Sequence, residues 1–229
     1  MKKFKLLSVV AVCLAAFAFT SCNTGGGDSF EWPTLDQQKS MISNLGYMQN
    51  GGLVYYNENK LNTKDVTDTI PNITINMSTS SNKDDKGNIT SYYSNASLMF
   101  PVKILSNFIS DEKLAAEIAK MTSVSAKVYL VPYQYATQRF IANTDDIKLG
   151  DITTEDNKTY KDVTIKFTAG YYAAGFVTNE KTKKQDFLIY IGAASIYVNN
   201  NQTSLLTNYK DAKGTLYPPV FWFTTDKSN

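Results

Sequence analysis

The chain has 229 residues, with 23 lysines and arginines against 21 acidic residues and no histidine. The absence of histidine excludes Ser-His-Asp and Cys-His catalytic arrangements and zinc sites built on imidazole. A chain of this length can bury enough apolar surface to fold as one large or two small domains.

The N-terminus has the pattern of a secretory signal. Three lysines lie within the first five residues, an apolar run covers residues 6–19, and Thr20 and Ser21 are small. This order of basic, apolar and small residues predicts a signal peptide over residues 1–21. The apolar run is also short for a permanent transmembrane helix, which needs about 20 residues.

The segment "LAAFAFTSC", residues 14–22, resembles the lipobox of bacterial lipoproteins. The resemblance implies that a peptidase cuts before Cys22 and that this cysteine carries fatty acyl chains such as palmitate. An ordinary signal peptide with an incidental cysteine is the alternative. With its glycine-rich continuation and Tyr/Asn/Thr-rich body, the chain resembles small envelope lipoproteins of unknown function from Bacteroides-type bacteria. That resemblance implies an outer-membrane anchor, facing either the periplasm or the outside.

Removal of residues 1–21 changes the charge and the thiol content. It takes away three lysines and no acid, which leaves 20 basic and 21 acidic residues and a net charge of about −1. A nucleic-acid partner needs a basic stripe that displaces counterions, and we expect no such partner. Cys13 leaves with the signal and acylation blocks Cys22, so we expect no disulfide and no cofactor in the folded body.

The next segments are predicted to be a tether and a helix. Residues 22–30 are polar and glycine-rich, which indicates a flexible lipidated tether, and we expect a single β-rich domain over residues 31–229. Thr34 and Gln37 form a capping-box pattern, and Gly46 is typical of a helix C-terminus. The apolar face of this helix is expected to hold Leu35, Met41, Ile42 and Leu45.

The remaining chain is rich in tyrosine, threonine, valine and isoleucine, which favour strands. Strands are predicted at residues 53–57, 72–79, 91–105, 126–135, 162–170, 174–178, 186–198 and 220–225. Residues 186–192 are apolar on both faces and indicate a central strand. One more helix is expected after Ser110 as N-cap, with Asp111 and Glu112 in its first turn. The pattern predicts a β-rich α+β fold, an antiparallel sheet or sandwich of roughly eight to ten strands with two short helices.

Carboxylates are the remaining candidates for catalysis. Acid pairs occur at Asp84-Asp85, Asp111-Glu112, Asp145-Asp146 and Glu155-Asp156. A glycosidase needs two carboxyl groups about 5 to 10 Å apart across a cleft, whereas these pairs lie in polar turns or at a helix start. Residues 82–90 partly resemble a calcium loop, but Lys86 stands at a ligand position, so a hairpin turn is favoured. We therefore expect no catalytic residue and no metal site.

The 15 tyrosines are the most unusual feature of the composition. They include the pairs Tyr55-Tyr56, Tyr92-Tyr93 and Tyr171-Tyr172. Adjacent strand residues point to opposite faces, so each pair is expected to bury one ring and expose the other. Exposed rings would suit a sugar or a protein partner, and the alternative is that tyrosine simply fits a half-buried strand. Trp222 is expected in the core, and Trp32 is expected either to pack on the first helix or to form an exposed contact.

The tripeptide Asp68-Thr69-Ile70 resembles the short Asp-Ser/Thr-apolar motif at which Bacteroides-type bacteria O-glycosylate exported proteins. The resemblance implies that Thr69 is a candidate O-glycosylation site, in a polar stretch before Pro71.

These observations predict a membrane-anchored, non-enzymatic envelope module that binds a glycan or an envelope protein. One alternative is a carboxylate-dependent glycan hydrolase. The other is a structural subunit of a surface assembly, for which a long unpaired edge strand is expected.

Overall fold

The computed structural model describes residues 31–57, 66–168, 170–179, 182–199 and 203–225. The predicted signal peptide, residues 1–21, and the predicted tether, residues 22–30, lie outside the described residues. The elements in chain order are α2 (Leu35–Leu45), β1 (Met48–Tyr56), β2 (Thr67–Lys83), β3 (Ile89–Phe100), the 3-10 helix η2 (Val102–Phe108), α3 (Glu112–Ala119), β4 (Val124–Gln134), β5 (Arg139–Thr144), β6 (Ile147–Thr153), β7 (Thr159–Phe167), β8 (Gly170–Thr178), β9 (Gln185–Tyr197), β10 (Tyr209–Lys210), β11 (Leu216–Tyr217) and β12 (Val220–Thr224).

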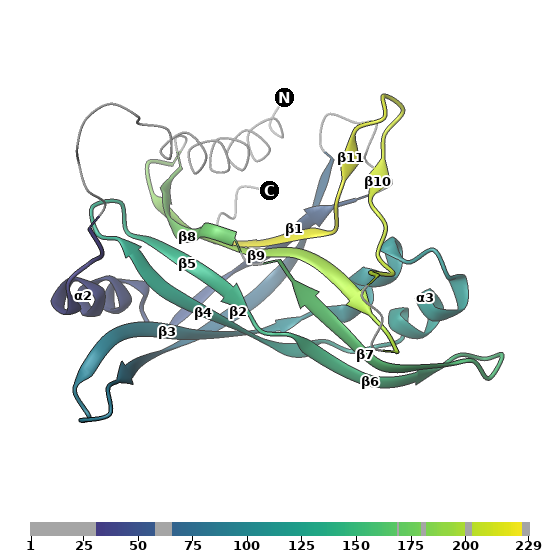
Figure 1. The fold of residues 1–229 in the computed structure, drawn as a ribbon. Coiled ribbons are helices and arrows are strands. Elements are labelled where there is room, and N and C mark those ends of the chain that lie inside the picture. The colour runs from purple at the N-terminus through teal and green to yellow at the C-terminus, as the bar shows by residue number, and fades with distance from the viewer. Residues whose placement is uncertain (1–30, 58–65, 169, 180–181, 200–202, 226–229) are drawn as a thin grey trace.

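Eight strands close into an antiparallel barrel in the order β12-β1-β2-β3-β4-β5-β8-β9 (Figure 1). Closure depends on β12, which pairs with β1 on one side and with β9 on the other. Phe223 is accordingly in register with both Leu53 and Ile189. The remaining part of β9 pairs with β7, and β7 with β6, so these two strands extend the sheet beyond the barrel.

The barrel confirms the predicted antiparallel, β-rich fold but not the sandwich. Inward and outward residues alternate along the strands of both architectures, so local patterns do not distinguish them. The prediction of a central strand at residues 186–192 is confirmed, because β9 pairs with β8, β12 and β7. The strand predicted at residues 162–170 corresponds to β7, which ends at Phe167, and its alternating apolar residues Val163 and Ile165 are buried.

Two glycines permit close backbone approaches in the sheet. A Cβ on Gly51 would lie 2.0 Å from the carbonyl oxygen of Thr224, at the seam between β1 and β12. Gly192 has a φ of 115°, and a Cβ there would lie 2.5 Å from the carbonyl oxygen of Thr168. Both obstacles are backbone atoms, so the two positions require glycine.

Aromatic and aliphatic side chains fill the barrel interior. Its largest fully buried residues include Phe100, Phe108, Phe140, Phe187, Phe221 and Phe223. The rings of Phe100 and Phe221 pack edge to face with their centroids 5.2 Å apart. One continuous core joins residues from Met41 to Phe223, so most of the described chain contributes to the same packed interior.

Helix α2 lies at one end of the barrel, at the left in Figure 1. The predicted capping box is present: the Thr34 side chain accepts from the backbone of Gln37, and the Gln37 side chain accepts from the backbone of Thr34. Asn44 Nδ2 donates to Gln138 Oε1 at 3.1 Å, which joins the helix to the β4–β5 turn. Met41, Ile42 and Leu45 are buried as predicted, whereas Leu35 is exposed.

The opposite end of the barrel carries η2 and α3 (Figure 1). The strand predicted to run through residue 105 ends instead at Phe100, because Pro101 lacks the N–H that a ladder needs, and the following apolar run forms η2. The N-cap of α3 is Asp111 rather than Ser110: its carboxylate accepts from the backbone N–H groups of Lys113 and Leu114.

Candidate functional site

A polar surface covers the outer face of β2, β3 and β4. Strand alternation sends Ile75, Leu98 and Val128 into the core and turns their neighbours outward. The outward residues are Thr74, Asn76, Ser78 and Ser80 on β2, Tyr93, Asn95, Ser97 and Met99 on β3, and Ser125, Lys127 and Tyr129 on β4. We call this set the β2–β4 outer face.

Antiparallel register arranges this face in rows across the three strands. Asn76 is paired with Ser97, and Ser97 with Lys127. The next row is Ser78, Asn95 and Tyr129. Directly paired residues have close side chains, so each row presents neighbouring polar groups.

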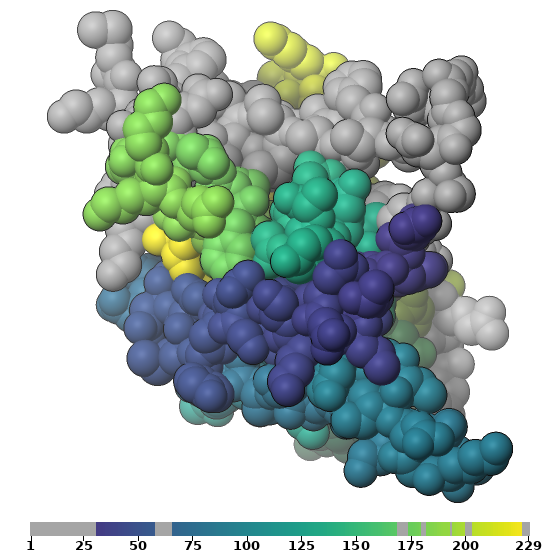
Figure 2. All heavy atoms as spheres, turned by 90° about the vertical axis from the view of Figure 1, so that its left-hand side faces the viewer, coloured from purple at the N-terminus to yellow at the C-terminus, as the bar shows by residue number. Residues whose placement is uncertain are grey.

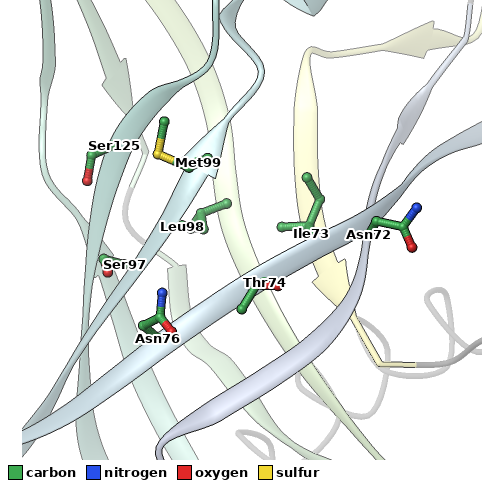
Figure 3. Close-up of a pocket in the computed structure, with 8 residues that line it drawn as sticks. All are labelled: Asn72, Ile73, Thr74, Asn76, Ser97, Leu98, Met99 and Ser125. Carbon is green, nitrogen blue, oxygen red and sulfur yellow. The ribbon is translucent and has the colours of Figure 1, made fainter.

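Two adjoining depressions follow these rows. The larger, about 490 Å³, is lined by Asn76, Met77, Ser78, Tyr93, Asn95, Ala96, Ser97, Lys127 and Tyr129. The smaller, about 290 Å³, is lined by Asn72, Ile73, Thr74, Asn76, Ser97, Leu98, Met99 and Ser125. Both include Asn76 and Ser97, which Figure 3 shows beside each other on β2 and β3. The two depressions therefore meet at this pair.

Two tyrosine rings line the larger depression. The rings of Tyr93 and Tyr129 have their centroids 6.2 Å apart and are tilted by 56°. The Tyr129 hydroxyl donates to Asp145 Oδ2 at 2.8 Å, and this hydrogen bond raises the pKa of Tyr129. The phenol stays protonated at neutral pH, and the bond fixes the ring at the edge of the face.

Several polar groups of this face are available to a ligand. Asn95 Nδ2 donates to Ser80 Oγ at 2.5 Å, so that amide is held within the face. Within the described ranges, the side chains of Asn76, Ser97 and Lys127 have no hydrogen-bond or ion-pair partner in the protein. An amide and a hydroxyl can each donate and accept a hydrogen bond. The junction of the depressions can therefore bind ligand groups that donate as well as groups that accept.

The predicted exposure of the tyrosine pairs is wrong where it can be seen. Tyr55 and Tyr56 are both half-buried, as are Tyr92 and Tyr93, and the side chains of the Tyr171-Tyr172 pair lie outside the described residues. Tyr55 stacks on Phe221, and Tyr56 packs edge to face on Trp222 and Tyr217. Side chains from another strand and from β11 thus cover the rings of this first pair.

The predicted acid pairs lie in turns, caps and ion pairs. Asp84 caps the β2–β3 hairpin by accepting from the backbone N–H groups of Lys86 and Asn88, which confirms the predicted hairpin turn. Asp145 accepts from Tyr129, and Asp146 lies 3.7 Å from Lys166. Among the described residues, no cluster of three or more acidic side chains is arranged to hold a metal ion.

The two remaining pairs form a charged cluster at the α3 end of the barrel. The Tyr160 hydroxyl donates to Asp111, Lys158 lies 3.2 Å from the same carboxylate, and Lys113 lies 2.6 Å from Asp156. The hydrogen bond from Tyr160 is the largest cause that lowers the pKa of Asp111 to about 2. Lys113 similarly lowers the pKa of Asp156 to about 2. A general acid needs the opposite shift.

The structure describes only one of the two predicted modification sites, Thr69. Thr69 lies within β2, half-buried and in register with Val54, so it belongs to a strand rather than to a loop. Its glycosylation stays a prediction. Cys22 lies outside the described residues, and its acylation also stays a prediction.

The tryptophans differ in exposure. Trp222 is buried, as predicted, and packs with Val54, Leu188 and Val220 on the side of β12 opposite to Phe221 and Phe223. Trp32 is 57% exposed and packs edge to face on Tyr133, with the ring centroids 5.4 Å apart.

In the part of the chain that the structure describes, no helix is long and apolar enough to span a bilayer. Comparison of the chain with models of known protein families, with curated proteins and with solved structures gave no match. The functional interpretation therefore depends on the geometry of the β2–β4 outer face and on the sequence.

Proposed function

We propose that the chain is a lipid-anchored protein of the outer membrane that binds a neutral oligosaccharide on its β2–β4 outer face, without a chemical step. The observation that carries the proposal is the pair of adjoining depressions lined by amides, hydroxyls and two tyrosine rings. Cys22 is the proposed point of lipid attachment, and either side of the membrane suits this role.

The chemistry of the face matches that of a sugar. A sugar presents hydroxyl groups that both donate and accept, as do Asn76 and Ser97. It also presents an apolar ring face, which can pack on Tyr93 or Tyr129, because tyrosine combines an apolar ring with a polar hydroxyl. A ligand that extends from one depression into the other would cross the Asn76–Ser97 pair.

Charge and apolar content favour a neutral sugar over a protein partner. Among the described residues, Lys127 is the only charged one that lines either depression. Met99, which is 54% exposed, is the one strongly exposed large apolar side chain of the face as described. The buried centre of a protein interface is usually richer in such side chains.

Binding is also favoured over hydrolysis. Of the four acid pairs, only Asp145-Asp146 lies near the face, and Asp145 accepts the Tyr129 hydrogen bond. Asp111 and Asp156, whose pKa values are lowered to about 2, lie in the charged cluster at the α3 end. These carboxylates support cap and ion-pair roles rather than general acid catalysis.

The sheet geometry favours the same function over that of an assembly subunit. Closure pairs every strand of the barrel on both sides. The outer edge of the extended sheet is β6, whose seven residues are interrupted by register shifts on both sides of Gly150. An edge interrupted by such shifts is a poor template for adding a strand.

The test is a glycan array probed with the full chain and with the Asn76→Ala, Tyr93→Ala and Tyr129→Ala variants. We expect binding to neutral oligosaccharides, and each variant should weaken it by about 2- to 10-fold or more, because one hydrogen bond or ring contact contributes about 0.5–1.5 kcal/mol.

The matched control is Tyr135→Ala, which removes an exposed tyrosine away from this face and should leave binding unchanged. A folded chain that binds no glycan would contradict the function. Unchanged binding by a Tyr93/Tyr129 double variant would instead show that the site is elsewhere.

A further inference from the structure

Exposed apolar side chains gather at the α2 end of the barrel. The strongly exposed large apolar residues of the described chain are Trp32, Leu35, Tyr47, Met48, Met99, Tyr135 and Leu216. Five of them belong to α2, to the segments that flank it, or to the β4–β5 turn beside it. We call Trp32, Leu35, Tyr47, Met48 and Tyr135 the α2-end patch.

The α2-end patch is built on a fixed scaffold. The Thr34–Gln37 capping box and a 2.8 Å hydrogen bond from Gln38 Nε2 to the Pro33 carbonyl hold the segment before α2 against the helix. The Asn44–Gln138 hydrogen bond holds α2 beside the β4–β5 turn. Figure 2 looks onto this end and shows α2 in purple with the β4–β5 turn in teal directly above it.

The two ends of the barrel differ in chemistry. At the α3 end, Lys113, Lys120 and Lys158 form ion pairs with Asp156, with Glu117 and Glu155, and with Asp111, respectively. The α2 end instead presents exposed aromatic side chains. Besides Trp32, these are Tyr47 and Tyr135, which are 86% and 42% exposed. The exposed apolar residues thus gather at the end opposite to the ion-paired cluster, where the β2–β3 hairpin also places Lys83, Asp84, Asp85 and Lys86 (Figure 1).

The short length of chain between the proposed anchor and α2 indicates that the partner of this patch is the lipid surface. Trp32 follows Cys22 by ten residues. Ten residues span at most about 36 Å even when fully extended. If Cys22 is acylated, the end of the barrel that carries Trp32 is therefore held close to the lipid surface.

We infer that the α2-end patch docks on the headgroup region of the bilayer that holds the lipid anchor. Tyrosine and tryptophan favour this region because one part of each ring system is apolar and the other can bond to water. This end carries charges of both signs, with Glu31, Asp36 and Lys39 in and before α2 and Lys83, Asp84, Asp85 and Lys86 on the β2–β3 hairpin, so the patch suits zwitterionic lipid. Docking by this end turns the α3 end away from the membrane and leaves the β2–β4 outer face at the side. The inference rests on the proposed anchor at Cys22.

The experiment separates docking from anchoring. The full chain, purified with its acyl groups, is reconstituted into phosphatidylcholine vesicles with bromine on the acyl chains, and co-flotation reports the anchor. The difference in fluorescence between wild type and Trp32→Phe isolates Trp32 from the buried Trp222. We expect a blue shift and bromine quenching of the Trp32 emission.

Paired variants identify the surface. A Leu35→Ser/Tyr135→Ser double variant should lose the blue shift and the quenching while it still floats with the vesicles. Leu216→Ser, which removes a 58% exposed residue outside the patch, should keep both. Flotation without quenching of Trp32 overturns docking and leaves the anchor intact. Failure to float overturns the anchor and docking together. Emission of Trp32 that depends on protein density instead of lipid overturns docking in favour of self-association.

Discussion

The hydroxyl of Tyr160 on β7 donates a hydrogen bond to the carboxylate of Asp111, 49 residues earlier at the start of α3. The carboxylate thereby caps α3 and joins it to the β6–β7 hairpin. Because this bond stabilises the charged form of Asp111, it couples the position of the hairpin to a titration well below neutral pH.

The lowered pKa of Asp111 predicts acid sensitivity. Its folded pKa of about 2 lies below the ordinary value of 3.8, so its stabilisation is complete above about pH 4 and is lost as the pH falls towards 2. In urea titrations, we expect the free energy of unfolding of wild type to fall more steeply over this range than that of Asp111→Asn, which keeps a cap without the charge. Asp156→Asn, in the same cluster, should flatten the profile similarly. Equal slopes in all three proteins would contradict the prediction.

Gly51→Ala is expected to destabilise the barrel by about 3 kcal/mol or more, because its Cβ would lie 2.0 Å from the Thr224 carbonyl oxygen. The control is Gly46→Ala, where φ is 71° and a Cβ meets no atom within 4 Å. That change should cost about 1–2 kcal/mol, from backbone strain alone. Thermal and urea unfolding measure both. Equal losses of stability in the two variants would mean that the backbones of β1 and β12 move apart to accommodate the added methyl group.

Ser94→Ala is expected to be neutral or stabilising. The Ser94 hydroxyl is buried, with no hydrogen-bond partner in the described part of the chain. Removing an unsatisfied buried hydroxyl relieves a penalty of about 1–3 kcal/mol, against the small cost of the lost oxygen volume. The control is Ser97→Ala, which changes an outward-facing serine of the same strand. It should change the free energy of unfolding by no more than about 0.5 kcal/mol. A marked loss in Ser94→Ala would reveal a partner for the hydroxyl.

The affinity of the proposed glycan complex should depend little on salt. In the part of the chain that the structure describes, only Lys127 brings a charge to the lining of the depressions, so we expect less than about a twofold change in Kd between 50 and 500 mM salt. Calorimetric titration of the best array ligand measures this, with Lys127→Ala as the matched variant. A strong salt dependence that Lys127→Ala abolishes would indicate an anionic ligand.

Cys22→Ala is expected to remove the protein from the acylated membrane fraction, because the lipobox resemblance makes this cysteine the site of acylation. Cys13→Ala, within the predicted signal peptide, should leave acylation unchanged. Metabolic labelling with a fatty acid followed by membrane fractionation distinguishes them. Label retained in Cys22→Ala would disprove the anchor.

Local patterns predicted local structure well. The Thr34–Gln37 spacing predicted the capping box because both of its hydrogen bonds lie within one helical turn. Alternation predicted β7, and two apolar faces predicted the central position of β9. Closure was missed because it depends on the pairing of Leu53 with Phe223, and nothing in either segment specifies its partner.

The proposed binding site, the β2–β4 outer face, was predicted only in part. The tyrosine argument included Tyr93 but not Tyr129, which has no adjacent tyrosine. Alternation of Asn, Ser and Thr with apolar residues along 72–80 and 91–99 is the signal from which the polar face could have been found. Its concave shape depends on the register of three strands and is absent from any one of them.

The seam between β1 and β12 also has a consequence for the order of events during synthesis. β1 is complete by residue 56, whereas its second neighbour begins at residue 220. Until that segment is made, β1 and the facing edge of β9 would expose unpaired backbone groups to other chains. We therefore expect the nascent protein to remain open, and prone to pair with other strands, for most of its translation.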